Sequence, residues 1–195
     1  MRYFILASLL WLATGAVPAM AIEEPAFTSV LRDGDYELRD YAAYLVAETR
    51  VDAGFDDAGD IAFGRLFRYI SGRNTGGSKI SMTAPVRQAP VDGTGQRVAF
   101  VVPSSFTRDT VPQPSDPQVV IREEPAQRLA VLRYSGRWTE ARFREHERKL
   151  RDWIARRALT ATGPAIYARY NAPFVPWPLR RNEVLIPVGG TPASR

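Results

Sequence analysis

Apolar and polar residues alternate along most of this chain, which is the pattern of strands that bury one face. Leu45, Ala47, Thr49 and Val51, for example, recur at every second position. Segments of this kind that are bounded by glycine, proline, asparagine or aspartate predict strands. The strands predicted in this way cover residues 27–31, 36–41, 43–51, 79–86, 97–102, 118–122, 128–134, 165–170 and 182–188.

Two segments have a helical period instead. In residues 60–71, apolar side chains recur at i, i+3, i+4 and i+7, which forms one stripe on a helix. These side chains are Phe63, Leu66, Phe67 and Ile70. Asp60 has a side chain suited to the N-cap. Gly64 costs about 1 kcal/mol relative to alanine inside a helix, which indicates that something approaches the backbone there.

The second predicted helix covers residues 139–159. Its buried face is expected to contain Phe143, Leu150, Ile154 and Ala158, with Trp153 at the border. Residues 52–59 and 103–117 lack either period and are expected to be loops.

The same order of elements occurs twice. Residues 72–86 predict a helix stop, a glycine turn and a strand that ends at Pro85, and Ala172-Pro173-Phe174 repeats the Ala84-Pro85-Val86 stop. The two halves cover about residues 27–103 and 118–188. Because one such unit cannot bury its sheet face alone, it would pair with the other. The expected fold class is α+β, with a strongly curved antiparallel sheet or open barrel that carries two helices.

Residues 1–21 are predicted to be a secretory signal peptide. Arg2 precedes the apolar run 3–13, and Ala19-Met20-Ala21 forms an Ala-x-Ala cleavage site before Ile22. An uncleaved anchor is the alternative. No later segment is apolar enough to cross a bilayer. We therefore expect one exported domain of residues 22–195 that is secreted or periplasmic and has no membrane partner after cleavage.

The net charge of +5 makes nucleic acid a partner to consider, and the absence of cysteine excludes disulfides and cysteine ligands for a metal. Basic residues do not form a continuous patch, because the densest basic stretch, 142–157, also contains Glu145, Glu147 and Asp152. This mixture is typical of a solvated helix face rather than of a phosphate-binding surface. Nucleic acid is therefore not an expected partner.

The sequence offers no catalytic or zinc constellation. His146 is the only histidine, so a zinc helix lacks its second ligand. No Gly-x-Ser-x-Gly motif is present, and residues 72–79 have Gly-Ser-Lys where a phosphate loop needs Gly-Lys-Ser/Thr. We expect a protein that is not an enzyme. His146 is expected at the surface or at the core boundary, and ligation of haem iron is its alternative role.

Phe63 and Phe67 beside Arg68 form the candidate binding site. Apolar rings next to a guanidinium suit a flat apolar ligand that carries carboxylates, because arginine can pair with a carboxylate through two hydrogen bonds. The same pattern also fits core residues beside a surface arginine.

Several motifs of this chain resemble those of the SOUL family of haem-binding proteins. The most specific is Lys-Ile-Ser-Met-Thr-Ala-Pro-Val at residues 79–86. The other matching segments are residues 36–41, 67–74, 134–136, 170–174 and 180–184. The resemblance covers residues 27–188. It implies a duplicated βαββ-type unit that forms a distorted antiparallel β-barrel flanked by two helices.

The resemblance also implies a ligand and a site. The ligand would be haem b or a porphyrin, bound in a shallow apolar groove beside the first helix. By position, the groove residues are Phe63, Phe67, Arg68, Phe174 and Val175. Where some members have a histidine that binds iron, this chain has Asp40. The implied mode is apolar contact with propionate pairing, and the alternative is a general binder or sensor of apolar small molecules that does not use haem.

Overall fold

The computed structural model describes residues 22–91 and 95–190, so the predicted signal peptide lies outside the described residues. Within them the chain forms ten strands and two α-helices, which confirms the α+β class. The helices are α1 (Phe55–Ile70) and α2 (Glu140–Arg156). The strands are β1 (Phe27–Asp33), β2 (Tyr36–Tyr41), β3 (Tyr44–Val51), β4 (Val86–Pro90), β5 (Gln96–Val101), β6 (Val119–Glu124), β7 (Gln127–Tyr134), β8 (Thr160–Ala161), β9 (Ile166–Arg169) and β10 (Asn182–Gly189).

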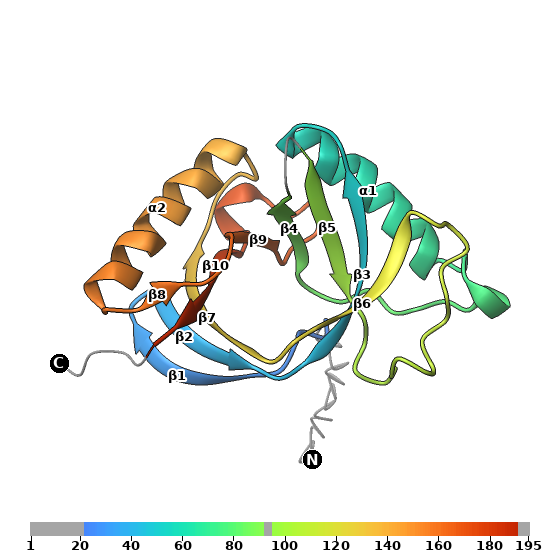
Figure 1. Ribbon diagram of the computed structural model, residues 1–195. Coiled ribbons are helices and arrows are strands. Elements are labelled where there is room, and N and C mark those ends of the chain that lie inside the picture. The colour runs from blue at the N-terminus through green and yellow to red at the C-terminus, as the bar shows by residue number, and fades with distance from the viewer. Residues whose placement is uncertain (1–21, 92–94, 191–195) are drawn as a thin grey trace, which may run out of the picture.

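The strands form one antiparallel sheet that curls into a half-barrel (Figure 1). Both helices lie outside the curl, with α2 over one half of the sheet and α1 over the other. Their order is β1-β2-β7-β10-β9-β4-β5-β3-β6, and β8 pairs with β10 off this path. The central pair, β9 and β4, joins the half that α2 covers to the half that α1 covers. Neither helix is long and apolar enough to cross a membrane.

Alternation along each strand divides the sheet into a helix face and an inner face. In β10, Val184 and Ile186 belong to the core under α2, whereas Leu185 belongs to a separate cluster with Tyr41 of β2. This is the period of two that places successive side chains on opposite faces of a sheet. α1 covers a second core, which includes Leu66 and residues of β3, β5 and β6.

α1 begins five residues before the predicted start at Asp60, and its N-cap is Gly54. Residues 55–59 were therefore wrongly predicted as a loop, whereas residues 52–54 precede the helix as expected. The buried stripe is also displaced from the predicted one. It starts at Phe55 and runs through Ala58 and Ala62 to Leu66, Tyr69 and Ile70. Two of the buried positions are alanines, which contribute little hydrophobicity. The prediction therefore placed the stripe on the larger Phe63 and Phe67 instead.

α2 is capped by Thr139, whose side chain accepts a hydrogen bond from the Arg142 amide. Phe143, Leu150 and Ile154 are buried as expected. Two predictions were wrong. Trp153 is buried, with its indole N–H donating to Asp33 at 2.9 Å, and Ala158 lies beyond the helix in an exposed position with φ 55°.

The predicted strand 79–86 is in fact an extended segment without ladder pairing up to Pro85, and β4 begins only at Val86. The Ala84–Pro85 peptide bond is cis. The strand then continues to Pro90 and pairs with β5 and β9. The proline therefore stands immediately before a central strand, where the missing N–H costs no ladder hydrogen bond.

The inner face holds a buried ion-pair network. The Arg39 guanidinium donates to Glu183 at 2.9 Å and 3.2 Å, and the Tyr170 hydroxyl donates to the same carboxylate at 2.7 Å. Arg181 lies 3.0 Å from Glu183. Burial opposes ionisation of Glu183, but hydrogen bonds from Arg39 and the charge of Arg181 hold its pKa below the ordinary value. The network therefore joins β2 to β10 by charge as well as by packing.

Candidate functional site

The outer side of α1 presents two stacked phenylalanine rings. Phe63 and Phe67 lie one turn apart, with their ring centroids 5.9 Å apart and their planes 11° from parallel. The Phe63 ring also packs edge-on against Phe100 of β5 at 5.3 Å, which anchors the pair to the sheet. Nevertheless, 39% of Phe63 and 49% of Phe67 remain exposed. The pair therefore forms an accessible aromatic surface rather than part of a closed core.

Gly64 lies next to these rings and leaves the helix backbone uncovered. A Cβ atom built on Gly64 would meet only the Arg68 guanidinium, at 4.0 Å. Among the described residues, therefore, nothing fills the space above this glycine. We call Phe63, Gly64 and Phe67 the aromatic patch.

Arg68 borders the aromatic patch on the side away from the rings. With about 100° per residue, Gly64 lies between Phe67 and Arg68 around the helix. Arg68 also lines a hollow of about 400 Å³ with Arg65, Tyr69, Arg73, Ser115, Asp116 and Pro117. Three guanidinium groups face one carboxylate there, and Arg65 lies 3.9 Å from Asp116. This arginine hollow can accept negatively charged groups of a ligand that lies on the aromatic patch.

The other two predicted groove residues lie on the connection between β9 and β10. Phe174 is 87% exposed, and Val175 is half-buried. Among the described residues, no ring contact joins Phe174 to Phe63 or Phe67. The structure thus brings Phe63, Phe67 and Arg68 together on α1, whereas Phe174 lies on the connection between β9 and β10 and makes no ring contact with the two phenylalanines.

Two further apolar side chains on the same connection were missed by the sequence analysis. Trp177 is 50% exposed and Leu179 is 73% exposed. The signal was present in the sequence, because Pro173, Pro176 and Pro178 prevent this segment from joining a strand. Apolar residues separated by such prolines are therefore expected to lie in a loop.

His146 lies at the edge of the core and not on the surface. It is 7% exposed, its ring stacks on Tyr134 at 3.6 Å, and its Nδ1 is 2.7 Å from the Arg142 carbonyl oxygen. Burial lowers the pKa of His146, and the contact with the Arg142 carbonyl opposes this shift. Ligation of haem iron by His146 would require this largely buried side chain to become accessible.

Asp40, at the position of the histidine in some family members, is paired with Arg128 on the neighbouring strand. Two hydrogen bonds of 2.6 Å and 2.7 Å join the guanidinium to the carboxylate. They hold the pKa of Asp40 below its ordinary value. In the described part of the chain, no group of three or more His, Asp or Glu side chains could hold a metal ion.

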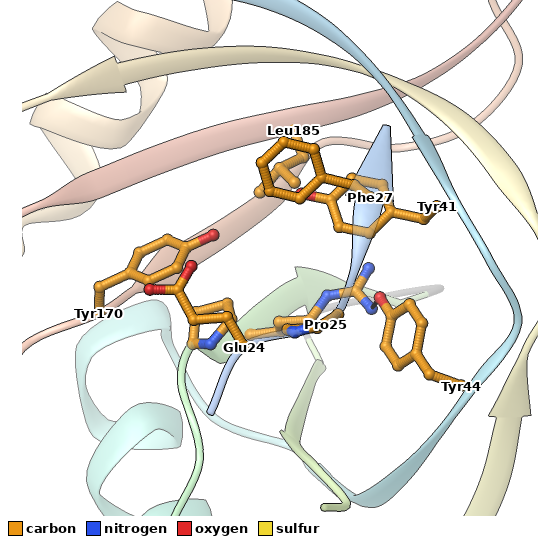
Figure 2. A pocket seen from close by; sticks show the side chains of 9 residues that line it. Glu24, Pro25, Phe27, Tyr41, Tyr44, Tyr170 and Leu185 are labelled. Atoms are coloured by element: carbon orange, nitrogen blue, oxygen red, sulfur yellow. Dashed lines mark hydrogen bonds between the residues drawn. The ribbon is translucent and has the colours of Figure 1, made fainter. Parts of the chain in front are cut away.

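A small pocket lies on the inner face of the half-barrel. Its volume is about 10 Å³, and it is bordered by the aromatic side chains of Phe27, Tyr41, Tyr44 and Tyr170. Glu24 and Pro25, from the segment before β1, lie across this inner pocket between Tyr170 and Tyr44 (Figure 2). A volume of this size holds about one water molecule. The inner pocket therefore offers no room for a planar macrocycle in this structure.

Comparison with known proteins gives consistent results. The family described as SOUL heme-binding protein matches residues 22–187. Heme-binding protein 1 of Mus musculus is 32% identical over 160 residues, which cover 78% of this chain and 83% of that protein. Heme-binding protein 2 of Homo sapiens is 29% identical over 129 residues, or 60% of this chain and 62% of that protein.

Among solved structures, the C-terminal domain of EcmrR is similar, with a TM-score of 0.64 at 11% identity, over 80% of this chain and 98% of that domain. At this identity the likeness concerns the fold alone. The match to the family model, in contrast, extends over nearly all of the described residues. This chain belongs to the SOUL heme-binding protein family.

Proposed function

We propose that this protein binds haem or a related tetrapyrrole on the aromatic patch and does not catalyse a reaction. The observation that carries the proposal is the exposed, stacked pair of Phe63 and Phe67 beside the uncovered backbone of Gly64. A planar apolar ring placed there would contact both phenylalanines and approach the helix closely. Family membership and the named haem-binding relatives support the same ligand class.

Arg68 would orient the ring. Its guanidinium lies next to Gly64 and lines the arginine hollow, so it can pair with a propionate of a macrocycle above the patch. None of Phe63, Gly64, Phe67 and Arg68 is a ligand for haem iron. Binding would therefore rest on apolar contact and charge pairing, and metal-free porphyrin would bind about as well as haem.

A general binder of apolar small molecules is the second candidate. The replacement of the iron-binding histidine of some members by Asp40, which is tied to Arg128, favours it. Such a protein would use the aromatic patch without selecting a tetrapyrrole.

We also propose that the chain is exported after cleavage at Ala21 and that its domain is duplicated. The pairing order supports the duplication. The first half has the order β2-β3-α1-β4-β5, and the second half has the matching order β6-β7-α2-β9-β10. The first strand of each half pairs with the second strand of the other half, since β2 pairs with β7 and β6 pairs with β3. β4 and β9 pair with each other at the centre. Cell fractionation and N-terminal sequencing of the purified protein test the export.

The main test is a titration of the protein with haemin and with protoporphyrin, followed by absorbance in the Soret region. We expect saturable binding of both. Phe67→Ala should weaken it about tenfold, because one large apolar contact is lost. Arg68→Ala should weaken binding a few-fold.

Two exposed residues elsewhere serve as matched controls. Val120→Ala on β6 and Arg133→Ala on β7 should bind like the original protein. Binding that Phe67→Ala and Arg68→Ala leave unchanged would refute the aromatic patch as the site. Loss of a shifted Soret band in His146→Ala alone would favour iron ligation by that histidine. Saturable binding of unrelated flat apolar dyes with no preference for porphyrin would favour the second candidate.

A further inference from the structure

The connection between β9 and β10 carries three large apolar side chains out into the solvent. Phe174 is 87% exposed, Leu179 is 73% exposed and Trp177 is 50% exposed. We call residues 173–179 the apolar loop. Single exposed apolar residues are normal on soluble proteins, but several large ones within one short segment indicate an interaction surface.

The apolar loop is held in a fixed shape by Arg180. Its guanidinium donates to the carbonyl oxygens of Pro173 at 2.6 Å and Val175 at 2.8 Å. The same guanidinium lies 4.1 Å from the ring centroid of Trp138. Prolines at 173, 176 and 178 restrict the backbone further. A surface that is already ordered binds its partner without a large loss of conformational entropy.

The surroundings of the apolar loop are basic. Residues 171–182 contain no aspartate or glutamate, and they include Arg180; Arg181 is paired with Glu24 and Glu183. Arg137, which is exposed, places its guanidinium 5.7 Å from the ring centroid of Trp177. Arginine beside an inserting apolar group is attracted to anionic headgroups. Tryptophan prefers the boundary between headgroups and acyl chains, because its ring is apolar and its N–H is polar.

We propose that the apolar loop docks this protein on membrane surfaces that contain anionic lipid. Phe174 and Leu179 enter the apolar side of the interface, and Trp177 with Arg137 lies at the level of the headgroups. Exposed apolar side chains beside arginine suit an anionic bilayer, because its headgroups attract the guanidinium and its apolar region takes up the side chains. This docking is separate from tetrapyrrole binding on α1, and it needs no membrane-spanning segment.

The test uses the chain from Ile22 to Arg195, which contains all the helices and strands described above, in the absence of haemin. The probes are vesicles of phosphatidylcholine alone and of phosphatidylcholine mixed with phosphatidylglycerol. We expect sedimentation with the mixed vesicles and a shift of Trp177 emission to shorter wavelength. Trp177→Ala should remove this shift.

Phe174→Ala and Leu179→Ala should each weaken vesicle binding about tenfold or more, as expected when one large apolar side chain no longer leaves water. Val120→Ala, at a residue that is 54% exposed on β6, is the matched control and should bind normally. The proposal is overturned if the protein does not bind mixed vesicles. It is also overturned if binding occurs but Phe174→Ala and Leu179→Ala leave it unchanged, since attraction by charge alone would then explain it.

Discussion

Gly64 is the residue at which helix stability and ligand access are in direct opposition. Its position in the middle of α1 lowers helix propensity, yet no described side chain except Arg68 comes near its missing Cβ. The space that a larger residue would fill is the space in which we place the macrocycle. A glycine at this position is therefore explained by ligand binding and not by packing.

Replacing Gly64 should separate the two effects. Gly64→Ala and Gly64→Leu are expected to raise the free energy of unfolding by about 0.5–1 kcal/mol, because both residues favour a helix. They are also expected to weaken porphyrin binding, more strongly for leucine, because a side chain then covers the backbone. Chemical denaturation and a Soret titration measure the two quantities. Unchanged affinity in Gly64→Leu would show that the ring does not lie over this residue.

At this scale the sequence predicted part of the geometry of the candidate site. It correctly linked Phe63, Phe67 and Arg68 on one helix, because spacing around a helix is fixed by its geometry. It could not tell whether the two rings faced the core, since that depends on where the sheet lies. Likewise, the exposure of Phe174 depends on how Arg180 holds the loop, which no local pattern encodes.

Among the elements, α1 shows why helix boundaries are harder to predict than strands. The alternating strands were placed within one or two residues of most observed ends, and β2 coincides with its prediction. The start of α1 was missed because the buried residues that follow Phe55, Ala58 and Gly59, carry little hydrophobic signal. A Cβ atom added at Gly59 would lie 2.9 Å from the Arg169 guanidinium, so that side chain would have to shift.

The ion pair between Arg39 of β2 and Glu183 of β10 should make the free energy of unfolding depend on pH. The pKa of Glu183 is held below its ordinary value of 4.5 in the folded protein. Its ion pairs therefore stabilise the fold at neutral pH and are lost as the pH falls below 4.5 through the folded pKa. Urea unfolding between neutral pH and about pH 3 measures this loss.

Glu183→Gln at neutral pH should cost about 3 kcal/mol, because it removes the fully buried carboxylate from Arg39 and leaves that guanidinium paired with the Glu37 carboxylate. It should also flatten the acid dependence. Glu145→Gln on the exposed side of α2 is the control and should have a much smaller effect. A cost for Glu183→Gln as small as that of the control would contradict the structural role of the buried pair.

At the scale of the whole molecule, the curled sheet encloses a space that the chain itself occupies. Glu23 and Glu24 fasten the segment before β1, through a hydrogen bond of 2.9 Å from the Ala84 amide to the Glu23 carbonyl and an ion pair of 2.8 Å with Arg181. This segment covers the aromatic residues of the inner pocket. The proposed site for a guest, the aromatic patch, lies on α1 outside the half-barrel (Figure 1).

Deleting residues 22–25 should open the inner pocket and leave the aromatic patch intact. We expect increased binding of a fluorescent apolar dye and unchanged affinity for protoporphyrin. Dye fluorescence and a parallel Soret titration provide the measurements. If the deletion reduces porphyrin affinity as strongly as Phe67→Ala does, the ligand contacts the inner pocket and the proposed position is wrong.

The occupied inner pocket has a consequence for how fast this protein exchanges its guest. A macrocycle on the outer surface of α1 keeps one side in water, so neither loading nor release requires the barrel to open. Its residence time is then set by surface contacts alone and stays short however stable the fold becomes. Such a carrier passes its cargo on readily, which suits hand-over between other molecules better than long-term storage.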